Sequence, residues 1–291
     1  MKNFIIILSL FFAQLAYAQE GQEIKQVSYP VGYQAQLNVV YTTVNNWDGK
    51  MDLYLAPKAN GPSPIIINIH GGGWARGSKD SQSGFGSLFK QGYSVANISY
   101  RLAVTDKAPA AIEDTRCALI YLIKNAKALN IDINKIVIMG SSAGGHLALM
   151  GGLLANNPIF DKNCAGEKNI KVAAIIDKYG VSDISEAALG DQSNRTVKFW
   201  LGDKFSDNEF KKSISPIYYV TKNSPPIFIV HGDADPTVSY QQSVELAKKL
   251  NKLGVKHEFI TVKKGGHGGF VADKSAEVSL KIIAFLKDLG I

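Results

Sequence analysis

The sequence predicts an α/β fold in which a mostly parallel, eight-stranded-type sheet is covered by helices on both faces. Continuous runs of branched apolar residues, such as residues 65–69, are typical of strands buried on both faces. These runs alternate with segments whose apolar residues have helical spacing, which favours parallel strand pairing. Ligands of such sheets bind beyond the carboxyl ends of the strands, so a functional site is expected in the loops that follow them.

The elements follow one another in a regular order. Residues 39–43 and 51–55 are predicted to form an antiparallel hairpin around Asn45-Asn46-Trp47-Asp48-Gly49. Buried strands are then expected at residues 65–69, 94–99, 136–139, 172–178, 227–230 and 257–262. Helices are expected at residues 109–125, 145–154, 240–253 and 276–289, where Pro109 suits a first turn and Gly254 a helix end.

One long interval interrupts this alternation. Residues 182–224 contain Phe199-Trp200-Leu201 and are expected to form a small cap, because long insertions often line binding sites. The rest of the chain shows no repeat, linker or low-complexity segment that would indicate a second domain. We therefore predict a single domain over residues 19–291.

The first 18 residues have the pattern of a cleavable signal peptide. Lys2 precedes an apolar run at residues 4–15, and Ala16-Tyr17-Ala18 provides small residues at the cleavage point. The run is too short to span a bilayer, and no second hydrophobic segment is long enough, so stable membrane insertion is not expected. We expect residues 1–18 to be removed and the mature chain to be secreted or periplasmic.

Composition excludes several classes of partner. The formal net charge is +7, but the basic residues are scattered in pairs without interleaved aromatics, which argues against nucleic acid. The five histidines and two cysteines show no metal-ligand spacing, and no cofactor or metal is expected. In an exported protein Cys117 and Cys164 can form a disulfide, or remain as two buried thiols; the sequence leaves both open, as it does the oligomeric state.

A nucleophile is predicted at Ser142. Gly140-Ser141-Ser142-Ala143-Gly144 lies between a predicted strand and a predicted helix, which is the pattern of a nucleophile elbow. Ser142 alone has the Gly-x-Ser-x-Gly frame, since a frame centred on Ser141 would need glycine in place of Met139. The alternative is a glycine- and serine-rich turn before a helix.

A serine hydroxyl needs a base, and the base needs an acid that orients it. His267 lies in the glycine-rich loop 265–269, between the last strand and the last helix, and is the candidate base. Asp233 and Asp235 both follow the strand at 227–230. We prefer Asp235 as the acid, with Asp233 shaping the turn.

Donors for an oxyanion are expected after an earlier strand. His70-Gly71-Gly72-Gly73-Trp74 follows residues 65–69 directly, and its HGGG pattern is known from lipases and esterases. The N–H groups of Gly72, Gly73 and Ala143 are the predicted donors. A phosphate-binding loop is the alternative, but no Gly-Lys-Ser/Thr follows.

Together these motifs resemble the α/β-hydrolase superfamily and, within it, the secreted hormone-sensitive-lipase-like esterases, especially the Bacteroides-type feruloyl/acetyl-xylan esterase group. The resemblance covers the chain from about Val39 onward. It implies an α/β-hydrolase fold, the acid at Asp235 and the base at His267. The motifs that carry it are residues 70–74, 99–102, 113–114, 140–145, 179–180, 215–216, 225–226, 231–238 and 266–270.

The resemblance implies a serine carboxylic-ester hydrolase that acts on acetyl or feruloyl esters of plant cell-wall polysaccharide, or on related short-chain esters. We expect Trp74, Tyr179 and Trp200 to contact a small-molecule or oligosaccharide ester. The long N-terminal helical cap of the lipases is missing from residues 19–38, which favours an open cleft. The alternatives are a general short-chain carboxylesterase, a serine aminopeptidase of the same fold, and a binding protein on a disabled hydrolase fold.

Overall fold

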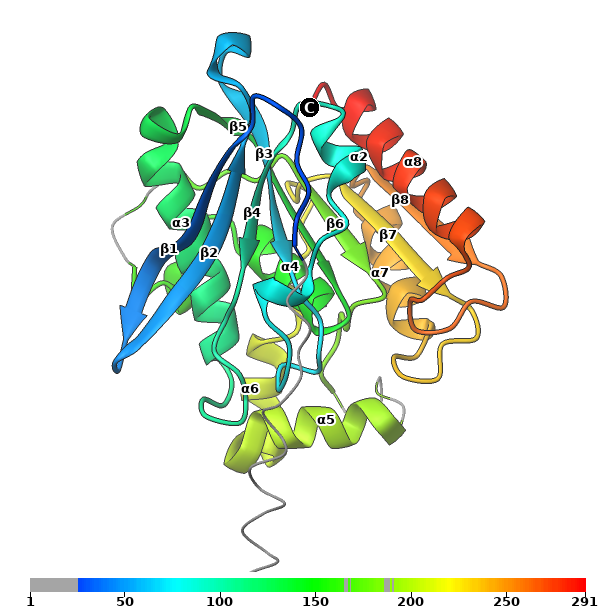
Figure 1. The fold of residues 1–291 in the computed structure, drawn as a ribbon. Coiled ribbons are helices and arrows are strands. Elements are labelled where there is room, and N and C mark those ends of the chain that lie inside the picture. The colour runs from blue at the N-terminus through cyan, green and yellow to red at the C-terminus, as the bar shows by residue number, and fades with distance from the viewer. Residues whose placement is uncertain (1–25, 165–166, 168, 186–188, 190) are drawn as a thin grey trace, which may run out of the picture.

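A computed structural model describes residues 26–164, 167, 169–185, 189 and 191–291 of the chain. The predicted signal peptide, residues 1–18, lies outside the described residues. Within them, eight strands form a single sheet in the order β1-β2-β4-β3-β5-β6-β7-β8 (Figure 1). The strands are β1 (Gln34–Val44), β2 (Trp47–Leu55), β3 (Ser63–Ile69), β4 (Ser94–Ile98), β5 (Ile131–Ser141), β6 (Ala174–Lys178), β7 (Ile227–Gly232) and β8 (His257–Val262).

The sheet is mostly parallel, as the sequence predicts. β2 pairs antiparallel with both β1 and β4, whereas the strands from β4 to β8 pair in parallel. The predicted hairpin is therefore β1 and β2. β1 is an edge strand whose pairing with β2 shifts register twice, between Gln36 and Val39 and between Val40 and Thr42.

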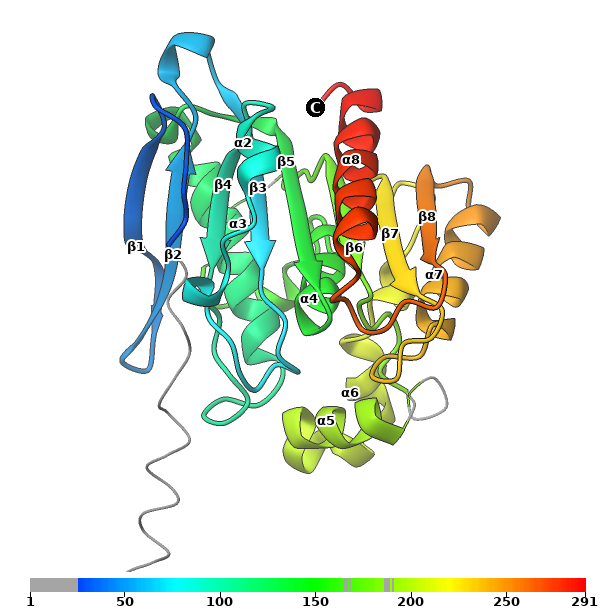
Figure 2. The same ribbon diagram turned by 45° about the vertical axis from the view of Figure 1, so that its right-hand side comes forward.

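Helices cover both faces. α3 (Ala110–Leu129), α4 (Ala143–Leu153) and α7 (Gln241–Lys252) lie on one face, and α2 (Gly86–Phe89) and α8 (Ala272–Asp288) on the other (Figures 1 and 2). α2 was not predicted, because a single turn is too short to show helical periodicity. The cap interval contains α5 (Asp191–Leu201) and α6 (Asn208–Ser213), which lie beyond the carboxyl ends of the strands.

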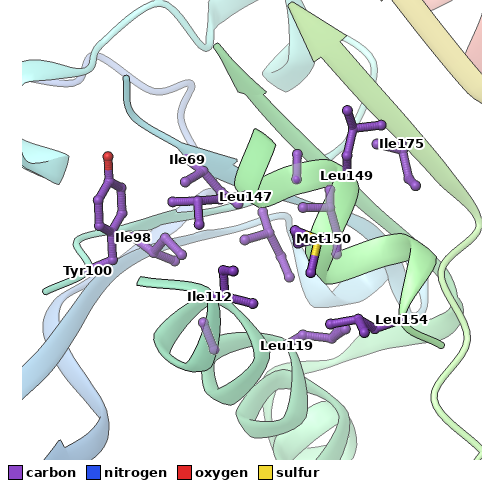
Figure 3. Close-up of a cluster of buried hydrophobic side chains, with 14 of the residues drawn as sticks. Ile69, Ile98, Tyr100, Ile112, Leu119, Leu147, Leu149, Met150, Leu154 and Ile175 are labelled. Carbon is purple, nitrogen blue, oxygen red and sulfur yellow. The ribbon is translucent and has the colours of Figure 1, made fainter. Parts of the chain in front are cut away.

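Strand alternation divides the core in two. Ile65, Ile67 and Ile69 of β3 face α3 and α4, while Ile66 faces α2 and α8. Figure 3 shows the first cluster, in which Leu147 and other α4 side chains lie between the sheet and α3. Each fully buried side chain of this kind contributes about 1.5–3 kcal/mol of transfer free energy. Both faces of the strands are thus buried, as their continuous apolar runs indicate.

Two links hold α3 to the segment that follows α4. Cys117 and Cys164 form a disulfide with a Cα–Cα distance of 5.3 Å. The fully buried Arg116 donates from Nε to Asp161 Oδ1 at 2.7 Å. Of the two alternatives left open by the sequence, the structure has the bridged one. No helix in the described part of the chain has the length and apolarity that a membrane span needs.

Candidate active site

The turn between β5 and α4 raises Ser142 above the carboxyl edge of the sheet. β5 ends at Ser141, α4 begins at Ala143, and Ser142 between them has φ 57° and ψ −123°. A Cβ on Gly140 would clash with the carbonyl of Gly144, and one on Gly144 would clash with the carbonyl of Ile69. The glycines of the motif are therefore required by close backbone approach, which is the geometry of a nucleophile elbow.

Ser142, His267 and Asp235 lie in a continuous hydrogen-bonded chain. Asp235 is an acceptor, so His267 Nδ1 donates to its Oδ2, at 2.6 Å. This leaves His267 Nε2 to accept from the Ser142 hydroxyl, at 2.8 Å. The structure thus brings together the three residues predicted from the sequence, although each follows a different strand.

Asp235 is buried and held by four donors. Its Oδ1 accepts the N–H groups of Thr237 and Val238 at 2.7 and 3.0 Å, and its Oδ2 faces His231 Nε2 at 3.1 Å as well as His267. Burial alone would raise the pKa of Asp235, but the hydrogen bonds from His231, His267 and the two N–H groups hold it below its usual range. Asp235 therefore stays ionised throughout the neutral pH range.

The second candidate acid has a different place. Asp233 Oδ1 accepts the N–H of Lys264, and its Oδ2 pairs with Lys263 at 3.3 Å. These contacts join the turn after β7 to the turn after β8 and do not involve His267. Asp233 therefore shapes the turn, which is the role predicted for it.

The oxyanion loop, residues 70–74, lies beside Ser142. Gly72, Gly73 and Ala143 all line the same cavity as Ser142 and His267. Within the described residues the N–H groups of Gly72 and Gly73 donate to no other group, and Ala143 is the first residue of α4, whose N–H has no acceptor in the helix. The predicted donors are therefore available in the cavity.

The cavity has a volume of about 580 Å³ and opens between the elbow and the cap. Phe199 and Thr196 of α5 form part of its wall. Arg76 and Arg195 stand exposed at its rim, and its described lining contains no aspartate or glutamate. An uncharged or anionic ester therefore meets no negative charge on entry.

Of the three predicted substrate contacts, the one assigned to Trp200 is wrong. Its side chain is fully buried and stacks on Trp74, with ring centroids 4.3 Å apart and planes 5° apart. Both rings lie against His146, whose Nδ1 accepts from Trp74 Nε1 at 3.2 Å. Trp74 lines the cavity, but its side chain is only 2% exposed. The sequence shows an aromatic residue on the cap but not which side of α5 turns inward.

Tyr179 does line the cavity, and it also contacts the base. Its ring packs edge-on against His267, with centroids 4.9 Å apart. Tyr179 follows β6 with a left-handed φ of 46°. Its position between the base and the elbow was not evident from the sequence.

Two buried histidines brace the site. The pKa of His70 is lowered to about 4 by burial, so its neutral ring donates from Nδ1 to the Gly71 carbonyl at 2.7 Å. Burial also lowers the pKa of His146 to about 4, and its Nε2 donates to the Ile214 carbonyl of the cap at 2.8 Å. His146 thereby joins α4, the oxyanion loop and the cap, a role that a histidine inside a helix does not reveal in a sequence.

The chain is similar to known esterases. It is 29% identical to Esterase LipC of Mycobacterium tuberculosis over 216 residues, which cover 71% of this chain and 53% of that protein. It thus spans about half the length of the curated relatives that it matches first.

Solved structures give similar results. A truncated form of a carbohydrate esterase from gut microbiota is 28% identical, with a TM-score of 0.74, over 91% of this chain and 99% of that chain. The bifunctional GH43-CE protein of Bacteroides eggerthii is 27% identical, with a TM-score of 0.75, over 88% of this chain and 38% of that chain.

A family model covers most of the site. The BD-FAE model matches residues 51–250, which include the oxyanion loop, the elbow and Asp235. His267 lies beyond the matched range and is placed by the structure, at hydrogen-bond distance from Ser142. The chain therefore belongs to the BD-FAE family of α/β-hydrolase-fold esterases.

Proposed function

We propose that this chain hydrolyses carboxylic esters through an acyl-enzyme formed on Ser142. The single observation that carries the proposal is the chain of contacts from Ser142 Oγ to His267 Nε2, at 2.8 Å, and from His267 Nδ1 to Asp235 Oδ2, at 2.6 Å. Ser142 and His267 line a cavity that is also lined by Gly72, Gly73 and Ala143, whose N–H groups are available as donors. These are the parts that acyl transfer needs: a nucleophile, a base with an orienting acid, and an oxyanion site.

In the first half-reaction, Ser142 Oγ attacks the ester carbonyl carbon while His267 Nε2 takes the hydroxyl proton. The N–H groups of Gly72, Gly73 and Ala143 donate to the oxygen that becomes negative. The tetrahedral species collapses, His267 returns the proton to the leaving alkoxide, and the alcohol departs. Asp235 stabilises the imidazolium without taking its proton.

In the second half-reaction, water attacks the acyl carbon and His267 accepts its proton. Collapse of the second tetrahedral species breaks the bond to Ser142 Oγ, which regains its proton from His267. The products are a carboxylic acid and the regenerated enzyme, so no cofactor is consumed.

Acetyl or feruloyl esters of plant cell-wall polysaccharide are the proposed substrates. The similar structures named as carbohydrate esterases support this choice. The cavity supports it as well, because it is open and bordered by exposed side chains of α5. Ranking acetylated xylan oligomers, methyl ferulate, short p-nitrophenyl esters and aminoacyl-p-nitroanilides by kcat/KM tests it. A preference for the anilides would replace the esterase proposal by a peptidase.

We expect Ser142→Ala to reduce kcat for p-nitrophenyl acetate by about 10⁴-fold or more, because the nucleophile is lost while binding remains. Circular dichroism and the unfolding midpoint serve as controls for folding. Ser141→Ala, one residue earlier, is the matched variant and should keep most of the activity. Full activity in Ser142→Ala would refute the assignment of the nucleophile.

Action outside the cytoplasm is part of the proposal and rests on the pattern of residues 1–18. Expression of the full chain in a bacterial host, followed by N-terminal sequencing, tests it. A mature chain that begins at Gln19 in the periplasm or medium is expected. Recovery of the uncut chain in the cytoplasm would contradict the proposal.

A further inference from the structure

A second cavity, of about 200 Å³, lies on the face of the sheet covered by α2 and α8. Its walls include Met139 of β5, Val230 of β7, Leu88 of α2, and Val278 and Ile282 of α8. It is separate from the catalytic cavity, with which it shares only Tyr179 among the described lining residues. The described lining combines these apolar side chains with the hydroxyl groups of Ser87, Ser275 and Ser279, so it suits an organic molecule that has both an apolar part and a polar group.

Lys178 carries the only charge among the described residues that line this cavity. Side chains alternate along β6, so Asp177 faces α4 whereas Lys178 faces α2 and α8. No carboxylate of the described chain lies within ion-pair distance of Lys178 Nζ. Burial lowers the pKa of the Lys178 amine, with no opposing charge nearby. An anion that enters the cavity could pair with the Lys178 amine, for which no carboxylate of the described chain competes.

The cavity also borders the catalytic base. Gly268, Gly269 and Phe270 line it and directly follow His267 in the chain. Tyr179 packs edge-on with both His267 and Phe270, with centroid distances of 4.9 and 6.1 Å. A molecule in the second cavity would therefore contact the segment that holds the base.

We infer that this cavity binds a small monocarboxylate. The carboxylate would pair with Lys178, and the apolar part would lie against Met139, Phe270 and Val278. The volume holds a molecule of the size of butyrate or benzoate, since one water occupies about 30 Å³ in the liquid. The single cation of the described lining matches the single charge of a monocarboxylate, whereas a phosphate dianion would bring a second charge that no further cation balances.

The test is calorimetric titration of the full mature chain with benzoate and with benzamide, its neutral isostere. Benzoate should bind the wild type at least about tenfold more tightly than benzamide does, because only the acid pairs with the amine. Lys178→Met should lose this difference. Lys171→Met is the matched control, since Lys171 is exposed and precedes β6 at the opposite edge of the sheet, and it should bind as the wild type does. Equal affinity of benzoate for the wild type and Lys178→Met would overturn the proposal.

A second measurement does not depend on the folding of the methionine variant. Reductive ¹³C-methylation gives each lysine an NMR signal, and Lys178→Arg identifies that of Lys178. Benzoate should raise the pKa of this signal, because pairing favours the charged amine. An unchanged titration in saturating benzoate would refute the site.

A panel of acids distinguishes two sources of the ligand, the product of the reaction and a free carboxylate. Tighter binding of the acid that the enzyme releases from its best ester than of other acids of equal size would identify the product as the ligand. Equal binding would identify a free carboxylate. Only the binding that Lys178→Met abolishes is counted, so that binding in the catalytic cavity is set aside; either ranking then supports the site, and no binding lost in Lys178→Met would exclude it. The ranking by released acid rests on the proposed function, whereas the calorimetric and NMR tests need no turnover at Ser142, so the site and the esterase proposal can fail separately.

Discussion

Asp235 Oδ2 lies between two imidazoles, His267 at 2.6 Å and His231 at 3.1 Å. His231 Nε2 also faces the Val238 carbonyl, so it must donate, and its Nδ1 accepts from the Ser243 hydroxyl. This fixes the tautomer of His231 and gives Asp235 a second donor that does not take part in the reaction. His231 is thus a positioning residue for the acid, and its contacts keep the carboxylate aimed at His267.

Asp177 is a buried carboxyl next to the site, and it predicts a pH dependence of stability. Its Oδ1 accepts the Gly180 N–H at 3.0 Å, while its Oδ2 has no partner within the described residues. Burial raises its pKa from 3.8 to about 6, against the effects of His231 and the Gly180 N–H. The folded chain therefore holds a proton that the unfolded chain releases, so stability is lost as pH rises from about 4 to above 6.

We expect Asp177→Asn to remove this loss. Its free energy of unfolding relative to the wild type should rise between about pH 4 and pH 7, by up to about 3 kcal/mol for a shift of two pKa units. Urea denaturation at both pH values measures it. Asp203→Asn is the matched control, because it makes the same substitution at an exposed position. A constant difference for Asp177→Asn would contradict the prediction.

At the scale of elements, α5 is joined to the oxyanion loop by packing. Trp200 stacks on Trp74, and Thr196 lies so close to Gly73 that a Cβ there would clash. The Ala108 N–H donates to the Trp200 carbonyl at 3.0 Å. The cap therefore supports the loop that supplies the oxyanion donors.

Removing the Trp200 ring should loosen this unit. Truncation of a fully buried tryptophan costs about 3–5 kcal/mol, and we expect Trp200→Ala to speed hydrogen exchange in Asp191–Leu201 and to lower kcat/KM. Phe199→Ala, next to it but with a side chain 46% exposed, should leave exchange in the helix nearly unchanged. Unchanged exchange in Trp200→Ala would show that the stack does not hold α5.

The fold could be predicted from the sequence because buried parallel strands leave continuous apolar runs, as residues 65–69 do. The strand boundaries were less exact: β5 begins at Ile131, which pairs with Ser63, rather than at 136, because residues 131–135 mix isoleucines with polar residues and do not form a continuous apolar run. The Ser142, His267 and Asp235 cluster was predicted by motif and order. The roles of Trp200 and His146 were not, since a pattern shows that a residue is aromatic or helical but not which neighbour its ring meets.

At the scale of the whole molecule, the functional groups and the covalent link lie in different places. Ser142, Asp235 and His267 follow the carboxyl ends of β5, β7 and β8. The Cys117–Cys164 disulfide instead joins α3 to the segment after α4. We therefore expect the bridge to bear on stability rather than on the positions of the reacting atoms.

We expect Cys117→Ser/Cys164→Ser to lower the free energy of unfolding by about 2–4 kcal/mol, because the bridge closes a loop across 47 residues. Urea denaturation with and without a reducing agent measures this. The reducing agent should destabilise the wild type by a similar amount and leave the double variant unchanged. Equal stability of the oxidised wild type and the double variant would contradict the prediction.

The two register shifts in β1 have a consequence for how the molecule behaves at high concentration. An edge strand exposes a row of N–H and C=O groups that another chain can pair with, and this is a route to aggregation. In β1 the shifts near Val39 and Thr42 lie in its pairing with β2, and such irregularities bend and twist a strand, so its free edge is a poor template although Leu37 and Val40 are exposed there. The irregular edge therefore protects the sheet against edge-to-edge association with further copies of the chain.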